Sequence, residues 1–168
     1  MSCVGTFYGH EAAGAPIVKA VLTRLRFPAD DVKACTKIVR EHLRPGFPGQ
    51  PISNKTLRKW VAEMGDLWED ALDHRVCDIA AHVIPEGIDP WAWAEEIRQR
   101  VRALPPDLAG FNQRALALSG EEIREGFKLD GKAIGKAKKL LVEAVIAGKV
   151  PNERAALLKF LAETPLVD

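Results

Sequence analysis

Two histidines in the first quarter of the chain each stand beside a glutamate. His10 lies in Gly-His-Glu, and His42 lies in Glu-His-Leu. His42 also falls at helical spacing with the apolar residues of its segment, which places it on an apolar face. A buried histidine near a second histidine and a carboxylate is either a hydrogen-bonded core residue or a ligand of a divalent metal. From these residues alone, the core role is favoured.

Helices must position both histidines, because almost no strand signal occurs in the chain. Glycine and proline separate apolar patterns of about 10–18 residues at helical spacing. Ser53, the pair Asp89-Pro90 and the capping-box pair Ser119 and Glu122 mark helix starts. Asn152 is predicted to cap the last helix. The sequence therefore predicts an all-α fold of about eight helices.

Composition limits the class of protein. The chain has 168 residues, 47% of them hydrophobic, and a net charge of +1, with basic ends around an acidic middle. This size predicts one compact core, with or without a small appendage. No apolar run reaches the ~18 residues that a membrane span requires, and the N-terminus lacks a signal pattern. The odd number of cysteines, Cys3, Cys35 and Cys77, indicates reduced thiols. We therefore expect a cytoplasmic protein without a membrane partner.

Two stretches resemble one known family. The letters FYGHEAAGA, LRFP and REHLRP follow one another between residues 7 and 45. They resemble the HD superfamily in the version carried by bacterial tRNA nucleotidyltransferases (CCA-adding enzymes) and poly(A) polymerases. Residues 116–161, with LSGEEI, FKLDGKAIG and GKVPNE, resemble the C-terminal end of the same enzymes. The resemblance implies a partial HD-like helical bundle over residues 1–106 and a small helical tail over residues 107–168.

The resemblance also implies three metal ligands, which are His10, His42 and Asp78. The family's earlier histidine, its His-Asp pair and its nucleotidyltransferase head with Gly-Ser and Asp-x-Asp motifs have no counterpart in the sequence. We therefore expect at most a weak, vestigial site for a divalent metal, no nucleotide addition by the chain alone and no assignable catalytic residue. A separate set, His74, Asp78 and His82 at four-residue intervals, is a less favoured alternative for a metal site.

Basic residues form two groups that suit RNA. Lysine and arginine contact phosphates without reading sequence, and the resemblance implies tRNA or another structured RNA as the partner. Solvated helix faces are the alternative explanation of such stripes, and no RNP-type aromatic motif is present. The predicted RNA-binding residues are Arg40, Arg44, Lys55, Arg58, Lys59, Lys132, Lys136 and Lys139.

Three functions remain open at this point. The first is a tRNA-binding helical protein, derived from the rear half of an HD-type nucleotidyltransferase, that works with a separately encoded catalytic head in tRNA 3′-end processing. The second is a minimal HD-domain phosphohydrolase, dependent on metal, that acts on a nucleotide or cyclic phosphate. The third is an interaction protein that mimics part of the enzyme.

Overall fold

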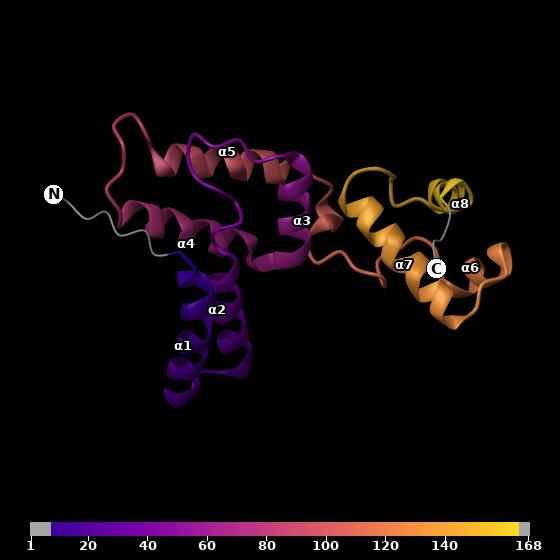
Figure 1. The fold of residues 1–168 in the computed structure, drawn as a ribbon, viewed down its shortest axis with the longest axis horizontal. Helices are drawn as coiled ribbons and strands as arrows, with labels where there is room; N and C mark the ends of the chain where they lie inside the picture. The colour runs from indigo at the N-terminus through magenta and orange to yellow at the C-terminus, as the bar shows by residue number, and fades with distance from the viewer. Residues whose placement is uncertain (1–7, 165–168) are drawn as a thin grey trace. The chain divides into compact units, whose positions relative to one another are not determined.

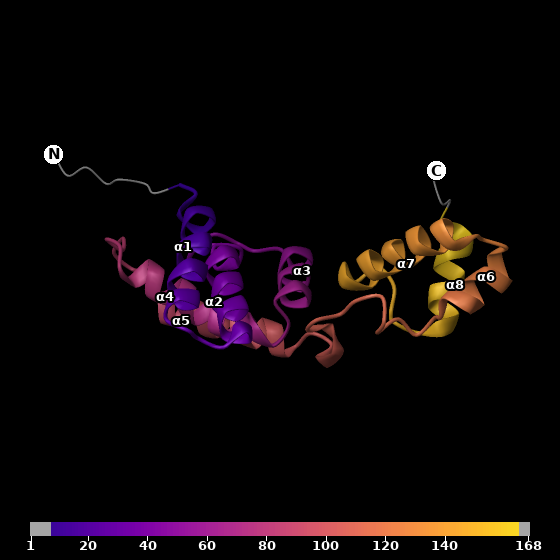
Figure 2. The ribbon, with the colours of Figure 1, turned by 90° about the horizontal axis from the view of Figure 1, so that it is seen from below.

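The computed structural model describes residues 8–164 and confirms the all-α prediction. Within that range the chain forms eight α-helices and two short 3-10 helices and contains no strand (Figures 1 and 2). None of these helices combines the length and the apolar character that a membrane span requires. The helices are α1 (His10–Arg24), α2 (Ala29–Glu41), α3 (Asn54–Met64), η1 (Gly65–Leu67), α4 (Trp68–Ala80), α5 (Pro90–Arg102), η2 (Pro106–Leu108), α6 (Gly120–Phe127), α7 (Gly131–Ile146) and α8 (Arg154–Glu163).

Side-chain caps fix several of the predicted helix starts. The Ser53 hydroxyl accepts a hydrogen bond from the backbone of α3, the Asp89 carboxylate accepts two from α5, and Ser119 with Glu122 forms the predicted capping box of α6. The prediction for Asn152 is wrong, because Glu153 is the N-cap residue of α8. The Asn152 amide instead binds the loop at residues 115–117, accepting from Ala117 N and donating to Ala115 O.

The described chain forms two compact units. The first unit contains residues 8–52 and 66–103, and the second unit contains residues 53–65 and 104–164. Helices α1 and α2 pack together in the first unit, as do α4 and α5, while α3 packs with α7 in the second unit. A division at residue 106 was predicted. That division assigns α3 to the first domain, whereas α3 belongs to the second unit here. The presence of an HD domain stays a prediction.

The core of each unit is apolar, as the helical periodicity predicts. In the first unit, Leu72, Val76 and Ile97 are buried between α4 and α5, and the second unit buries Leu57 and Trp60 of α3. Each unit therefore has an apolar core of its own. Cys35 and Cys77 are free thiols, and Cys3 lies outside the described residues.

Candidate functional site

Three predicted ligands converge in the first unit. His10 opens α1, His42 directly follows α2, and Asp78 lies in the last turn of α4. One ligand atom from each residue lies within 4.8 Å of the others. The prediction that the three side chains converge is confirmed, and the prediction that they bind metal stays a prediction.

The contacts of His42 fix the tautomer of its imidazole ring. His42 is only 2% exposed, and its Nδ1–H donates to the carbonyl oxygen of Val39 at 2.7 Å. Burial lowers the pKa of His42, as do the neighbouring imidazoles of His74 and His10, so the neutral ring is favoured. In a neutral ring with Nδ1 protonated, Nε2 can only accept. His10 Nε2, 3.1 Å away, therefore donates to His42 Nε2.

The spacing of the three residues fits a divalent ion in size. The Nε2 atoms of His10 and His42 are 3.1 Å apart, and the Asp78 oxygens lie 3.8 Å and 3.7 Å from them. Ligands about 2.0–2.2 Å from a tetrahedral zinc ion lie roughly 3.3–3.6 Å from one another, so the distances need only small adjustments. His10 Nε2 would also have to lose the proton that it donates to His42 before it could bind a metal. The Nδ1–H bond of His42 also orients its ring, as a partner of a metal-binding histidine does.

The spacing of the cluster suits a divalent ion, but its charge is less favourable, because a nearby arginine pairs with the carboxylate. Arg75, one turn before Asp78 on α4, donates from Nη1 to Asp78 Oδ2 at 2.5 Å and from Nε to Gly46 O at 2.9 Å. Its side chain is 12% exposed, and its guanidinium lies over the Phe47 ring, 5.9 Å from the centroid. The single carboxylate of the ligand set is thus already balanced by a cation. A carboxylate that is already paired with a cation attracts a divalent ion less strongly than an unpaired one.

The other two histidines join the same cluster. The His74 ring stacks on His42 with centroids 4.7 Å apart, and His82 Nε2 lies 3.8 Å from Asp78 Oδ1. All four histidines of the chain therefore gather around Asp78 and His42. The sequence predicts two alternative metal sites, one of His10, His42 and Asp78 and one of His74, Asp78 and His82. In the structure these residues form one cluster.

The predicted RNA-binding residues divide between the two units. Arg40 is exposed on α2 and Arg44 pairs with Glu41 at 3.0 Å, both in the first unit. The other six belong to the second unit, on two helices. Lys55, Arg58 and Lys59 lie on α3, and Lys132, Lys136 and Lys139 lie on α7.

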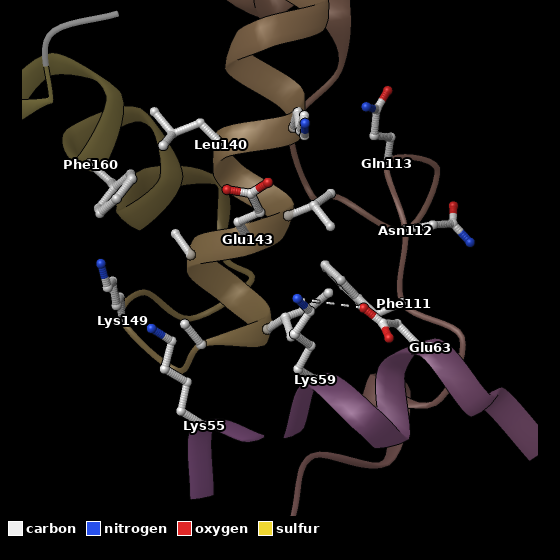
Figure 3. A pocket seen from close by; sticks show the side chains of 15 residues that line it. Lys55, Lys59, Glu63, Phe111, Asn112, Gln113, Leu140, Glu143, Lys149 and Phe160 are labelled. Carbon is white, nitrogen blue, oxygen red and sulfur yellow. Dashed lines mark ion pairs between the residues drawn. The ribbon is translucent and has the colours of Figure 1, made fainter. Parts of the chain in front are cut away.

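A groove in the second unit collects basic side chains from both helices. Its volume is about 570 Å³. Lys55 and Lys59 of α3, Lys139 of α7 and Lys149 beyond the end of α7 line it (Figure 3). Lysines nearly a hundred residues apart in the sequence thus meet at one surface. The remaining lining residues are mostly apolar, with two amides and two carboxylates: Glu63, Phe111, Asn112, Gln113, Leu140, Val142, Glu143, Ala144, Ile146, Ala147 and Phe160.

Arg58 has a structural role in this unit. Its Nε donates to the Ile146 carbonyl oxygen at 2.7 Å, and its Nη2 donates to the Val145 carbonyl oxygen at 2.9 Å. These carbonyls belong to the last turn of α7, where backbone oxygens lack helical partners. Arg58 therefore joins α3 to the C-terminal end of α7. Sequence reasoning grouped Arg58 with the neighbouring lysines because nothing local reveals a partner 87 residues away.

Sequence reasoning also missed Arg75, Lys149 and Phe160. Arg75 has a local signal, because residues three apart on a helix are neighbours and it precedes Asp78 by three positions. Lys149 and Phe160 have none, since only the packing of α3, α7 and α8 brings them to the groove.

Comparison with known proteins gives two curated relatives. A CC-adding tRNA nucleotidyltransferase from Thermus thermophilus is 33% identical over 151 residues, which cover 89% of the chain and 32% of the relative. An A-adding tRNA nucleotidyltransferase from Deinococcus radiodurans is 29% identical over 168 residues, which cover 95% of the chain and 37% of the relative. The chain thus spans about a third of the length of these relatives. No family model and no solved structure matches it. The chain is related to the tRNA nucleotidyltransferases, in their C-terminal part.

Proposed function

We propose that the chain binds structured RNA, and tRNA in particular, through the basic surface of its second unit. The observation that carries this proposal is the convergence of Lys55, Lys59, Lys139 and Lys149 around one groove. Lys132 and Lys136 continue the basic surface along α7, since positions 132, 136 and 139 share one helix face. The names of both relatives state that they act on tRNA, which supports tRNA as the ligand.

The lysines are available for phosphate contacts. Lys55, Lys139 and Lys149 are exposed and form no ion pair within residues 8–164, and Lys59 makes only a loose pair with Glu63 at 3.9 Å. An exposed ammonium loses little hydration on meeting a phosphate, and the counterions that it releases from the RNA favour binding. Binding of this kind follows the shape of the phosphate backbone, so folded tRNA should bind better than a single strand of equal length.

We propose further that nucleotide addition needs a nucleotidyltransferase head that residues 8–164 do not contain, and that the chain serves tRNA 3′-end processing together with such a head. An apolar face of α1 and the turn after it supports a partner of this kind. Ile17, Leu25 and Phe27 are 62%, 58% and 49% exposed there. A face of this composition is typical of a protein contact. The purified chain alone should not incorporate labelled CTP or ATP into tRNA.

Charge reversal on the groove tests the RNA proposal. Lys55, Lys139 and Lys149 would each be changed to glutamate, and tRNA affinity would be measured by gel shift at low salt. The matched control reverses Lys19, Lys33 and Lys159, which are exposed lysines outside the groove, and so changes the net charge equally. We expect the groove variant to lose at least tenfold in affinity and the control much less. Equal losses, or no tRNA binding by the unchanged protein, would overturn the proposal.

A metal-dependent phosphohydrolase is the second candidate, supported by the convergence of His10, His42 and Asp78. These residues would hold a divalent ion, which acts as a Lewis acid toward a phosphate. Because Arg75 already balances Asp78, we expect weak metal binding and weak or no turnover. Robust metal-dependent hydrolysis of a nucleotide or cyclic phosphate, abolished by His42→Ala, would place this candidate first.

A further inference from the structure

We propose that the groove of the second unit accepts one unpaired nucleotide of the bound RNA, whose base stacks on Phe160 and whose phosphates lie at Lys55 and Lys149. This inference rests on the proposed RNA binding and adds the kind of RNA feature that is recognised. It concerns a single site, lined by α3, α7 and α8.

The size of the groove suits a nucleotide. Its volume of about 570 Å³ lies within the range of roughly 300–1,000 Å³ that is typical of small-molecule sites. A bare phosphate would leave most of this space empty, and a helical duplex is too wide to enter it. A single base with its sugar has the right dimensions.

The chemistry at one end of the groove matches the parts of a nucleotide. Figure 3 shows the Phe160 ring, the Lys149 amine and the Lys55 amine along the same side of the groove. Phe160 is half-buried, so it is held by packing while part of the ring remains accessible. An aromatic ring flanked by cations is the arrangement with which proteins bind unpaired nucleotides, because every base has a stacking face and every linkage has a negative charge.

A carboxylate adds a preference among the bases. Glu143 of α7 lines the same groove, and the stick view shows its carboxylate on α7 below the Leu140 side chain (Figure 3). An ionised carboxylate can only accept hydrogen bonds. A base with N–H donors on its exposed edge is therefore favoured. Guanine, whose N1–H and N2–H lie side by side, is favoured most, and uracil with its two carbonyls is favoured least.

The test compares two RNAs of equal charge and two variants of Phe160. One RNA is a hairpin with guanine in an unpaired loop, and the other is a blunt duplex of the same number of phosphates. Base stacking contributes about 1–3 kcal/mol, so the unchanged protein should bind the hairpin roughly tenfold more tightly. Phe160→Leu retains apolar volume and lacks the ring, and it should remove this advantage. Phe160→Tyr retains the ring and should keep the advantage.

A second readout follows the base itself. With 2-aminopurine at the unpaired position, the unchanged protein and Phe160→Tyr should quench its fluorescence, and Phe160→Leu should not. RNA binding that is equal for hairpin and duplex, or a Phe160→Leu variant that still quenches, would overturn the nucleotide site and leave RNA binding in place. If the unchanged protein binds neither RNA at low salt, the proposed function itself fails, and the nucleotide site fails with it.

Discussion

The histidine cluster of the first unit and the groove of the second unit use charged side chains in opposite ways. In the first unit, buried His42 and nearly buried Arg75 direct their polar atoms at neighbours in the same unit. In the second unit, the groove lysines point into solvent, and three of them form no ion pair among the described residues. Charges that already satisfy one another stabilise a fold, whereas exposed like charges around one groove can attract a ligand.

The cluster nevertheless keeps the shape of a ligand site. The side chains of His10, His42 and Asp78 come from α1, the end of α2 and α4 and lie close together, and Arg75 pairs with Asp78. We infer that this cluster now joins these helices.

Trp60→Ala should destabilise the second unit more than any other single change considered in this protein. The Trp60 side chain is completely buried, and removing a buried aromatic side chain typically costs about 3–5 kcal/mol. Its Nε1 has no hydrogen-bond partner among the described residues, so Trp60→Phe should cost much less. Urea unfolding measures both. Equal losses of stability for the two variants would contradict this and would show that the indole nitrogen has a hydrogen-bond partner.

Arg58→Met should lower stability without removing the RNA surface. The change removes two hydrogen bonds to the end of α7 and leaves two carbonyl oxygens without those partners, which should cost about 2 kcal/mol. Lys59→Met, one position further on α3, should cost less than about 0.5 kcal/mol because Lys59 is exposed. Unfolding curves give the stabilities. Under conditions where both variants are folded, Arg58→Met should retain tRNA affinity within about threefold, and a tenfold loss would return Arg58 to the RNA-binding residues.

Arg75→Gln should strengthen metal binding. Glutamine removes the positive charge that balances Asp78, and a cation at the cluster would then meet an uncompensated carboxylate. We expect the affinity for Co²⁺, followed by its visible absorption, to rise by about tenfold, which corresponds to about 1.4 kcal/mol. Arg102→Gln, an exposed arginine of α5, is the control. Unchanged or weaker Co²⁺ binding by Arg75→Gln would mean that Arg75 orients Asp78 for the metal and does not compete with it.

Removing the ion pair of Glu122 and Arg154 should change stability least. The hydrogen bonds that Glu122 makes with Arg154 and Ser119 lower its pKa from 4.5 to about 2. A lowered pKa in the folded protein stabilises it fully above the unfolded value, and this stabilisation is lost as the pH falls from about 4.5 toward 2. Glu122→Gln should therefore melt slightly lower than the unchanged protein at pH 6, and the difference should shrink by pH 3. A difference that grows on acidification would contradict this.

The sequence was sufficient for the helices and for part of the cluster. Periodicity and capping residues such as Ser53 and Ser119 are local, so they predict where helices begin. The family resemblance brought His10, His42 and Asp78 together. Arg75 has a local signal in its i,i+3 spacing to Asp78, but its contacts with Gly46 and Phe47, in a loop far away along the chain, have none.

The groove could not be predicted for a related reason. The groove forms because α3 packs with α7 in the second unit, although the segments before and after α3 belong to the first unit. No local sequence pattern predicts this packing. Lys55 and Lys139 are predicted to bind RNA from their charge, their helical spacing and the family resemblance. Their meeting with Lys149 and Phe160 is a property of tertiary packing, as is the use of Arg58 as a link between helices.

The salt dependence of tRNA binding tests whether the groove lysines contact phosphates. If the groove lysines neutralise phosphates, the logarithm of the binding constant should fall linearly with the logarithm of salt concentration. Changing Lys55, Lys139 and Lys149 to glutamine should reduce that slope by about 2–3, since each phosphate contact contributes roughly 0.7–0.9. Glutamine at Lys19, Lys33 and Lys159 should leave the slope unchanged. A slope that is equal in all three proteins, or binding that does not respond to salt, would contradict the assignment of RNA binding to this groove.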